Sequence, residues 1–157
     1  MERLELLRKC DVFRELNDAQ LQTIWKIATT KTLSPGATLC KQDDIGENFY
    51  VVADGLVAII LELGPLSQRQ VQVASNCDAV NWSALIEPYK CTATAKALEK
   101  TKVLALNSQD LNEIFTKFPE IESKIFKGVA RLVATRLRNA YAQLVGVVSP
   151  DETQGEI

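Results

Sequence analysis

Histidine is absent from the 157 residues of this chain, and its absence narrows the chemistry that the chain can perform. Histidine is the commonest metal ligand and the usual general base of enzymes. The sequence also lacks a P-loop, a nucleophile elbow and paired carboxylates at a motif spacing. We therefore predict a protein that is not an enzyme and that uses no metal or other cofactor.

Long apolar runs and paired cysteines are missing as well. No apolar run approaches the roughly 20 residues of a membrane span, and the first residues mix charges with leucines rather than forming a signal peptide. The four cysteines, which form no C-x-x-C pair, are expected to be reduced thiols. A net charge of −2 creates no overall field that attracts nucleic acid or anionic lipid. We expect a cytoplasmic protein that binds neither membranes nor nucleic acid directly.

The apolar pattern changes period along the chain. Residues 1–28 carry apolar side chains at helical spacing, and Asn17 offers an N-cap for the second of two short helices. From residue 29 to 107, short runs rich in β-branched and aromatic residues alternate with turns every eight to twelve residues. Asp54-Gly55 has the composition of a tight hairpin turn, and residues 68–74 alternate between valine and polar side chains. This pattern predicts an antiparallel β-sandwich or roll.

Residues 108–147 are predicted to form two helices. Ser108 is expected to cap the first, and Pro119 lies in the first turn of the second, where proline is well tolerated. One apolar stripe of the long second helix would cover the roll. This stripe consists of Ile121, Ile125, Val129 and Leu132, and it continues into the polar residues Arg136, Asn139 and Gln143. We interpret the arginines of this helix as a solvated face or a partner contact.

A second stripe, here called the seam, follows the same helix further than one small roll requires. Its members are spaced alternately by four and three residues, and none is charged. They are Phe126, Ala130, Val133, Leu137, Ala140, Leu144 and Val147. A period of 3.5 residues over three heptads is typical of a helix–helix interface, so the seam predicts a homodimer. The competing interpretation is that the helix folds back and buries the seam on its own roll.

Residues 76–97 interrupt the strands with a single helical turn at Trp82-Ser83-Ala84-Leu85, a break at Pro88 and a new strand near Cys91. A helix start leaves backbone N–H groups without intrahelical partners and carries the positive end of the helix dipole. Such a geometry attracts an anion, typically a phosphate. We call this segment the cassette and predict a ligand pocket beside it.

The order of these parts resembles the cyclic-nucleotide-binding domain of the catabolite activator protein superfamily, from Leu4 to about Val147. The residues that carry the resemblance are Phe13-x-x-Leu16, Pro35-Gly36-x-x-Leu39, Phe49-Tyr50-Val51-Val52-x-x-Gly55 and Ala93-Thr94-x-x-Ala97. The resemblance implies an antiparallel β-roll with N-terminal helices, a phosphate-binding cassette and a long C-terminal helix. The family's best-known function, DNA binding, requires a helix-turn-helix after that helix, and we expect none in this chain.

The sequence departs from the family where the ligand would lie. The family's Gly-Glu pair, which holds the ribose hydroxyl, aligns with Asn81-Trp82, and its phosphate-binding arginine aligns with Cys91, beside Lys90. Each lost charge-assisted contact costs about 1.5–3 kcal/mol, and two such losses could lower affinity more than about a thousandfold. We expect cyclic nucleotides to bind poorly or not at all, while a different small anion remains a candidate ligand.

The candidate ligand-binding residues are Asn81, Trp82, Ser83, Ala84, Lys90, Cys91, Thr92 and Thr94, with Tyr141 as a lid. Alternatively, Trp82 and Tyr89 only pack the cassette and ligand binding has been lost. We expect one domain over 1–147 and a disordered tail over 148–157. The predicted function is a non-enzymatic regulatory module that senses a ligand. The alternative is an interaction or dimerisation module that acts with a separate DNA-binding or signalling partner.

Overall fold

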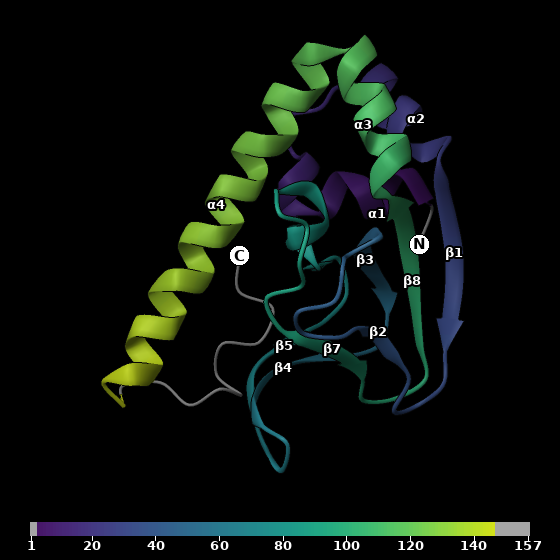
Figure 1. Ribbon diagram of the computed structural model, residues 1–157. Coiled ribbons are helices and arrows are strands. Elements are labelled where there is room, and N and C mark those ends of the chain that lie inside the picture. Colours follow the sequence, from purple (N-terminus) through teal and green to yellow (C-terminus); the bar gives the residue numbers. More distant parts are fainter. Residues whose placement is uncertain (1–2, 147–157) are drawn as a thin grey trace.

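The computed structural model describes residues 3–146, and Figure 1 shows their arrangement. The chain begins with α1 (Arg3–Lys9), the 3-10 helix η1 (Asp11–Phe13) and α2 (Asp18–Trp25). Asn17 caps α2 as predicted, because its side chain accepts the Gln20 N–H at 2.9 Å while the Gln20 side chain accepts the Asn17 N–H at 3.0 Å. This reciprocal capping box fixes the start of the helix.

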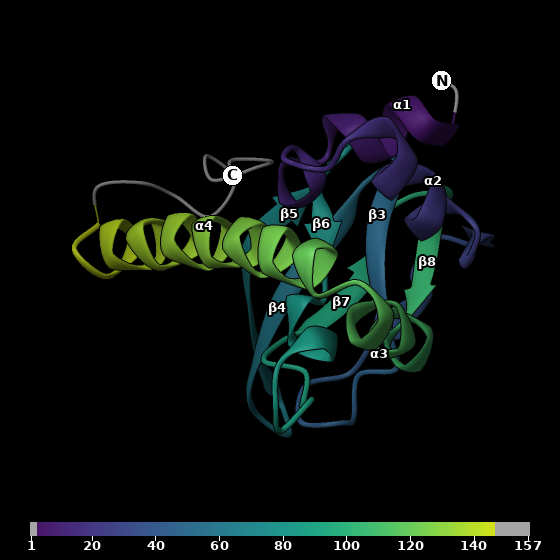
Figure 2. The same ribbon diagram turned by 90° about the horizontal axis from the view of Figure 1, so that it is seen from above.

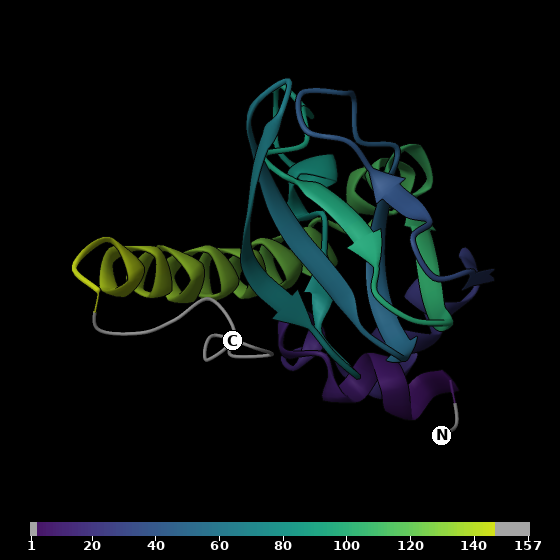
Figure 3. The ribbon, with the colours of Figure 1, turned by 90° about the horizontal axis from the view of Figure 1, so that it is seen from below.

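Eight strands follow and form two antiparallel sheets of four, in the orders β1-β8-β3-β6 and β2-β7-β4-β5. The strands are β1 (Ala28–Leu33), β2 (Thr38–Cys40), β3 (Asn48–Asp54), β4 (Val57–Gly64), β5 (Ser67–Ala74), β6 (Ala79–Val80), β7 (Thr94–Ala97) and β8 (Thr101–Asn107). The predicted antiparallel roll with N-terminal helices and a long C-terminal helix is confirmed (Figure 3). Among the described residues, no helix combines the length and apolar character that crossing a bilayer requires.

The turn at Asp54-Gly55 is not the predicted hairpin. β3 pairs with β6 and β8, whereas β4 pairs with β5 and β7, so this turn passes the chain from one sheet to the other. Gly55 has a φ of 130°, and a Cβ there would lie 2.8 Å from the Thr101 Cα. Glycine is therefore required for this crossing, and the local turn composition did not reveal which strands pair.

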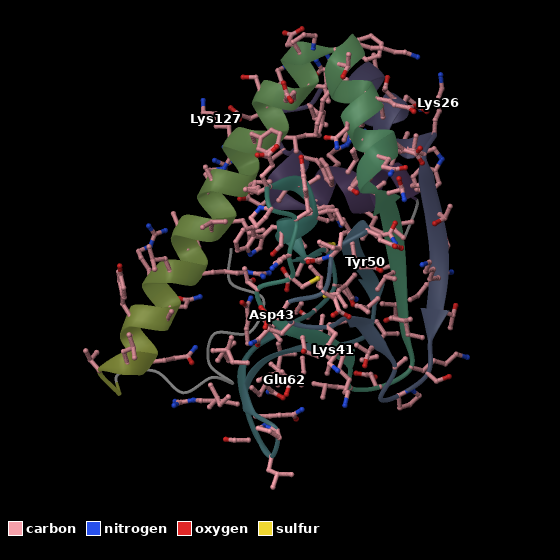
Figure 4. The ribbon with its side chains drawn as sticks, in the orientation of Figure 1. Lys26, Lys41, Asp43, Tyr50, Glu62 and Lys127 are labelled. Carbon is pink, nitrogen blue, oxygen red and sulfur yellow. The ribbon has the colours of Figure 1, made fainter. Side chains whose placement is uncertain are left out.

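The side chains of β3 divide the interior into two cores. Phe49 and Val51 belong to the core between the first sheet and the helices, where Phe49 meets Phe13 edge to face with ring centroids 5.8 Å apart. Tyr50 and Val52 point the other way and belong to the core inside the roll, where Figure 4 shows Tyr50. This division follows from the two-residue period of a strand.

The last two helices are α3 (Ser108–Lys117) and α4 (Pro119–Leu144). The N-cap of α3 is Asn107 rather than Ser108, since the Asn107 side chain accepts the N–H groups of Gln109 at 2.9 Å and Asp110 at 3.1 Å. Pro119 occupies the first turn of α4 as predicted. The first apolar stripe of α4, including Ile125 and Leu132, is buried as predicted.

The first half of α4 packs closely on the N-terminal segment. Gly128 lies against the backbone of Val12 in η1, and the Arg131 guanidinium approaches the carboxylates of Asp11 at 3.7 Å and Glu15 at 3.3 Å. The second half runs past the edge of the roll (Figure 2). The predicted disordered tail at 148–157 lies outside the described residues. That residues 1–147 form one independent domain stays a prediction.

Candidate functional site

The cassette contains its helical turn where the sequence predicted it. Asn81 adopts a left-handed conformation with a φ of 66°, which asparagine tolerates better than most residues. The 3-10 helix η2 (Trp82–Leu85) follows directly. The Asn81 side chain donates to the Asn48 carbonyl at 2.9 Å and so ties the turn to β3.

Three polar groups of the cassette make hydrogen bonds within the protein, and anion binding by the cassette stays a prediction. The Ala84 N–H donates to the Asn81 carbonyl at 3.2 Å, and the Ser83 hydroxyl donates to that of Thr92 at 3.5 Å. The Thr94 hydroxyl accepts the Gln42 N–H at 3.0 Å. The Ala84 N–H is therefore not free to bind an anion in this arrangement.

Three other predicted residues lie away from a common pocket. The Lys90 side chain is exposed and does not line the cavity described next. Cys91 is buried, and burial raises its pKa, so it is a neutral thiol. Tyr141 is 59% exposed and does not line the cavity described next. The structure therefore does not place the predicted cation and lid together.

A cavity of about 530 Å³ lies between β4, β5, the cassette and α4. Of the predicted ligand-binding residues, Trp82 and Thr92 line it. The other lining residues are Ile59, Leu61, Arg69, Val71, Gln72, Ala93, Arg136, Asn139, Ala140, Gln143 and Leu144. Its volume falls in the range of about 300–1,000 Å³ that is typical of small-molecule sites.

Arg136 is the central polar residue of this cavity, and its prediction as a solvated or partner-facing side chain is wrong. Its Nη2 donates to the Ala79 carbonyl at 2.7 Å, while its Nε is buried without a hydrogen-bond partner among the described residues. Burial lowers the pKa of Arg136 to about 10, partly offset by the Asp78 carboxylate. The guanidinium is therefore still charged at neutral pH.

Two amide side chains of the cavity also have buried N–H donors without a hydrogen-bond partner among the described residues. Gln72 Nε2 and Asn139 Nδ2 are buried without an acceptor among the described residues. An unsatisfied buried donor costs about 1–3 kcal/mol, and such groups are rare in native proteins. Three N–H donors around one cavity, one of them on a cation, form a surface complementary to an anion.

Gln72 of β5 lines the cavity because the regular alternation of side-chain directions along this strand is interrupted. Ile59 pairs with Gln72 and Ile60 with Gln70, so Val71 is an extra residue in β5. Such a bulge changes the direction of the side chains beside it. The Val71 carbonyl accepts the Gln143 side chain of α4 at 2.9 Å. The predicted simple alternation over residues 68–74 is wrong at this point.

The sequence analysis missed Gln72, Arg136 and Asn139 as site residues. A signal existed for the two on α4, because residues 132, 136, 139 and 143 continue the spacing of the buried stripe. A polar residue that continues a buried stripe faces the same way as the stripe. For Gln72 the sequence carries no comparable signal, because the bulge depends on how β5 pairs with β4.

Some residues of the seam make contacts within the protein, and others are exposed. Near its start, the Phe126 ring lies 5.6 Å from that of Phe115, and Val133 packs on the helical core. Ala140 and Leu144 line the cavity, although Leu144 is still 82% exposed, and Leu137 is 49% exposed. Ala130 is exposed, and Val147 lies outside the described residues. The seam thus contains both intramolecular contacts and an unpaired part.

Comparisons with known proteins agree with this fold. The family model of the cyclic nucleotide-binding domain matches residues 30–118. Cyclic nucleotide-gated channel alpha-4 from Mus musculus is 23% identical over 124 residues, which are 76% of this chain and 21% of the channel subunit. The chain thus spans about a fifth of the length of that relative.

Two solved structures extend the likeness to most of the chain. The N-terminal domain of a transcriptional regulator from Streptomyces coelicolor has a TM-score of 0.70 and 29% identity, covering 88% of this chain and 94% of the other. A cyclic nucleotide-binding domain from Methylobacillus flagellatus has a TM-score of 0.79 and 15% identity, covering 93% and 82%. The second similarity concerns the fold alone.

Proposed function

The chain belongs to the family of cyclic nucleotide-binding domains, and we propose that it is a non-enzymatic regulatory module that senses a small anion in the cavity beneath α4. One observation carries the proposal. Gln72, Arg136 and Asn139 line a single cavity, and the Gln72 Nε2, the Arg136 Nε and the Asn139 Nδ2 are buried without an acceptor among the described residues. A bound anion would satisfy these donors.

The sensing step follows from the elements that the cavity joins. α4 contributes Arg136, Asn139 and Gln143, while β4, β5 and the cassette contribute the opposite wall. A ligand that contacts both sides binds the docked position of α4 more tightly than any other position. It shifts the population toward that position in proportion to the difference in affinity. The position of α4 is then the output of the module.

Binding is measured through Trp82, which lines the cavity, in a Trp25→Phe background that removes the other tryptophan. Cyclic AMP, cyclic GMP, inorganic phosphate and 2-naphthoate are titrated while Trp82 fluorescence is recorded. Hydrogen exchange by mass spectrometry then follows the amides of residues 136–144. We expect one probe to change the fluorescence with saturation and to slow exchange in α4. Saturable binding that leaves α4 exchange unchanged would contradict a regulatory role.

A second function, a dimerisation module, is supported by the exposed part of the seam. Leu137 and Leu144 present apolar surface to solvent in this chain, and burying one leucine contributes about 1.5–3 kcal/mol. In a twofold dimer each such residue is buried twice. The partner would be a second copy of this chain, and the dimer would act with a separate DNA-binding or signalling protein.

Sedimentation velocity at micromolar concentration tests the dimer. We expect a dimer for the wild type and a monomer for Leu137→Glu, because two like charges would meet near the axis. Lys127→Glu, on the same helix but away from the exposed seam residues, is the matched control and should leave the dimer intact. A wild-type species of 17.4 kDa would refute this second function. The cytoplasmic location stays a prediction.

A further inference from the structure

We propose that the ligand of this cavity is an amphipathic carboxylate, with its carboxylate on Arg136 and an apolar body against β4, β5 and the end of α4. The proposal rests on the proposed sensing function and narrows it to a class of ligand. Three features of the cavity have to support this proposal. Its charge has to favour an anion, its donors have to suit a small planar group, and its remaining wall has to suit an apolar body.

The charge of the cavity selects an anion. Arg136 and Arg69 both line it, and none of its described lining residues is acidic. Arg69 is exposed and lies toward solvent, whereas the Arg136 Nε is buried. An anion would therefore meet Arg69 on entry and reach Arg136 inside, where the low dielectric strengthens the interaction.

The available donors suit a carboxylate. The Arg136 Nη2 is bonded to the Ala79 carbonyl, whereas the buried Nε–H has no partner among the described residues. The amide donors of Gln72 and Asn139 line the same cavity. Guanidinium groups match the planar geometry of carboxylates. Together these groups offer three N–H donors to one planar anionic group, and the nearby Asp78 carboxylate offsets part of the Arg136 charge.

A phosphate group is disfavoured for a separate reason. The cassette that would hold it has bonded its Ala84 N–H to Asn81 and its Thr94 hydroxyl to Gln42, and Lys90 is exposed outside the cavity. A phosphate dianion would therefore lose the Ala84 N–H as a donor and would find no second buried cation among the described residues that line the cavity.

The remaining wall determines the body of the ligand. It is formed by aliphatic side chains together with Trp82. These aliphatic residues are Ile59, Leu61, Val71, Ala93, Ala140 and Leu144. The described side chains of this wall carry no carboxylate to accept sugar hydroxyls, so a polyhydroxylated body lying against it would lose most of its hydrogen bonds to water. An aromatic or branched apolar body fits this wall.

The test uses the full chain and isothermal titration with 2-naphthoate and its neutral analogue 2-naphthamide. We expect 2-naphthoate to bind at least about tenfold more tightly than the amide. Arg136→Met should weaken 2-naphthoate by about 10- to 100-fold, the range expected when a charge-assisted hydrogen bond in a buried site is lost. Arg138→Met is the matched control, because Arg138 is exposed on the same helix, and it should leave the affinity unchanged.

Two further variants keep the test decisive if Arg136→Met does not fold. Arg136→Lys retains the charge and should retain part of the affinity for 2-naphthoate. Leu61→Asn, which changes only the apolar wall, should weaken 2-naphthoate about tenfold while leaving its preference over 2-naphthamide intact. Equal binding of 2-naphthoate and 2-naphthamide, or the same 2-naphthoate affinity in Arg136→Met as in wild type, would overturn the proposal.

The outcomes also separate this proposal from the function on which it rests. If inorganic phosphate or cyclic AMP binds in the cavity and protects α4 while 2-naphthoate does not bind, the ligand class is wrong and the sensing function stands. If no probe binds and none slows exchange in α4, both proposals fail.

Discussion

Gly128→Ala is expected to destabilise this protein, although helix propensity alone predicts the opposite. Alanine is favoured over glycine inside a helix by about 1 kcal/mol, and Gly128 lies in the middle of α4. However, a Cβ at residue 128 would lie 2.8 Å from the carbonyl carbon and Cα of Val12, and closer still to its oxygen. These are backbone atoms of η1, which cannot rotate away.

The magnitude follows from the shift that the extra methyl group requires. Real Cβ contacts are essentially never shorter than 3.0 Å, so α4 must move away from η1 by about 1 Å. Overpacking in a well-packed region costs about 1–3 kcal/mol, and the gain in helix propensity offsets about 1 kcal/mol of that. We expect a net loss of up to about 2 kcal/mol, which for a chain of this size lowers the melting temperature by up to about 4–8 °C.

Urea unfolding followed by circular dichroism measures this loss. Ser123→Ala is the control, because Ser123 is exposed on the same helix and also gains propensity on substitution. The control should be as stable as the wild type or slightly more stable. A Gly128→Ala protein that unfolds at the same or a higher urea concentration than the wild type would refute the close packing of α4 on η1.

Two further predictions concern ligand specificity and pH. Cyclic AMP and cyclic GMP should show no micromolar binding by calorimetry, because Trp82 and Cys91 replace the family's acidic residue and arginine. A micromolar dissociation constant for either nucleotide would show that other contacts replace those of the acidic residue and the arginine. Burial raises the pKa of Cys10 and Cys40 from about 9 to about 12, so the stability that these thiols contribute is complete below pH 9 and decreases as the pH rises from 9 toward 12. The urea midpoint of the wild type should therefore decrease when the pH is raised from 8 to 10.5, and it should decrease less steeply in Cys10→Ala. The same dependence of the midpoint on pH in both proteins would contradict the assignment to Cys10.

The fold was predictable because its signals are local and repeated. Buried β3, the capped α2 and the proline at the start of α4 each follow from a short stretch of sequence, and together they support one architecture. The pairing of strands is not local. For this reason the turn at Asp54-Gly55 was expected to form a hairpin, although its two strands belong to different sheets.

The site was predicted less well, because it depends on contacts between distant segments. The cassette was located correctly, but the sequence does not show that its Ala84 N–H and Thr94 hydroxyl are already bonded. Nor does it show that α4 passes close enough to bury Arg136 against Ala79, 57 residues earlier in the chain. The sequence thus reveals that Cys91 replaces the family's arginine, but it does not reveal that Arg136 of α4 is buried beside the cassette.

The close contact of Gly128 with η1 makes this residue the pivot of α4 once the Gln143–Val71 hydrogen bond, which ties the far end of the helix to β5, is released. The helix rises about 1.5 Å per residue, so Arg136 lies about 12 Å from this point and Leu144 about 24 Å. A small rotation of the helix moves Leu144 about twice as far as it moves Arg136. A change of 1 Å imposed by a ligand at Arg136 would thus become a change of about 2 Å at the exposed end of α4, where a neighbouring protein could detect it.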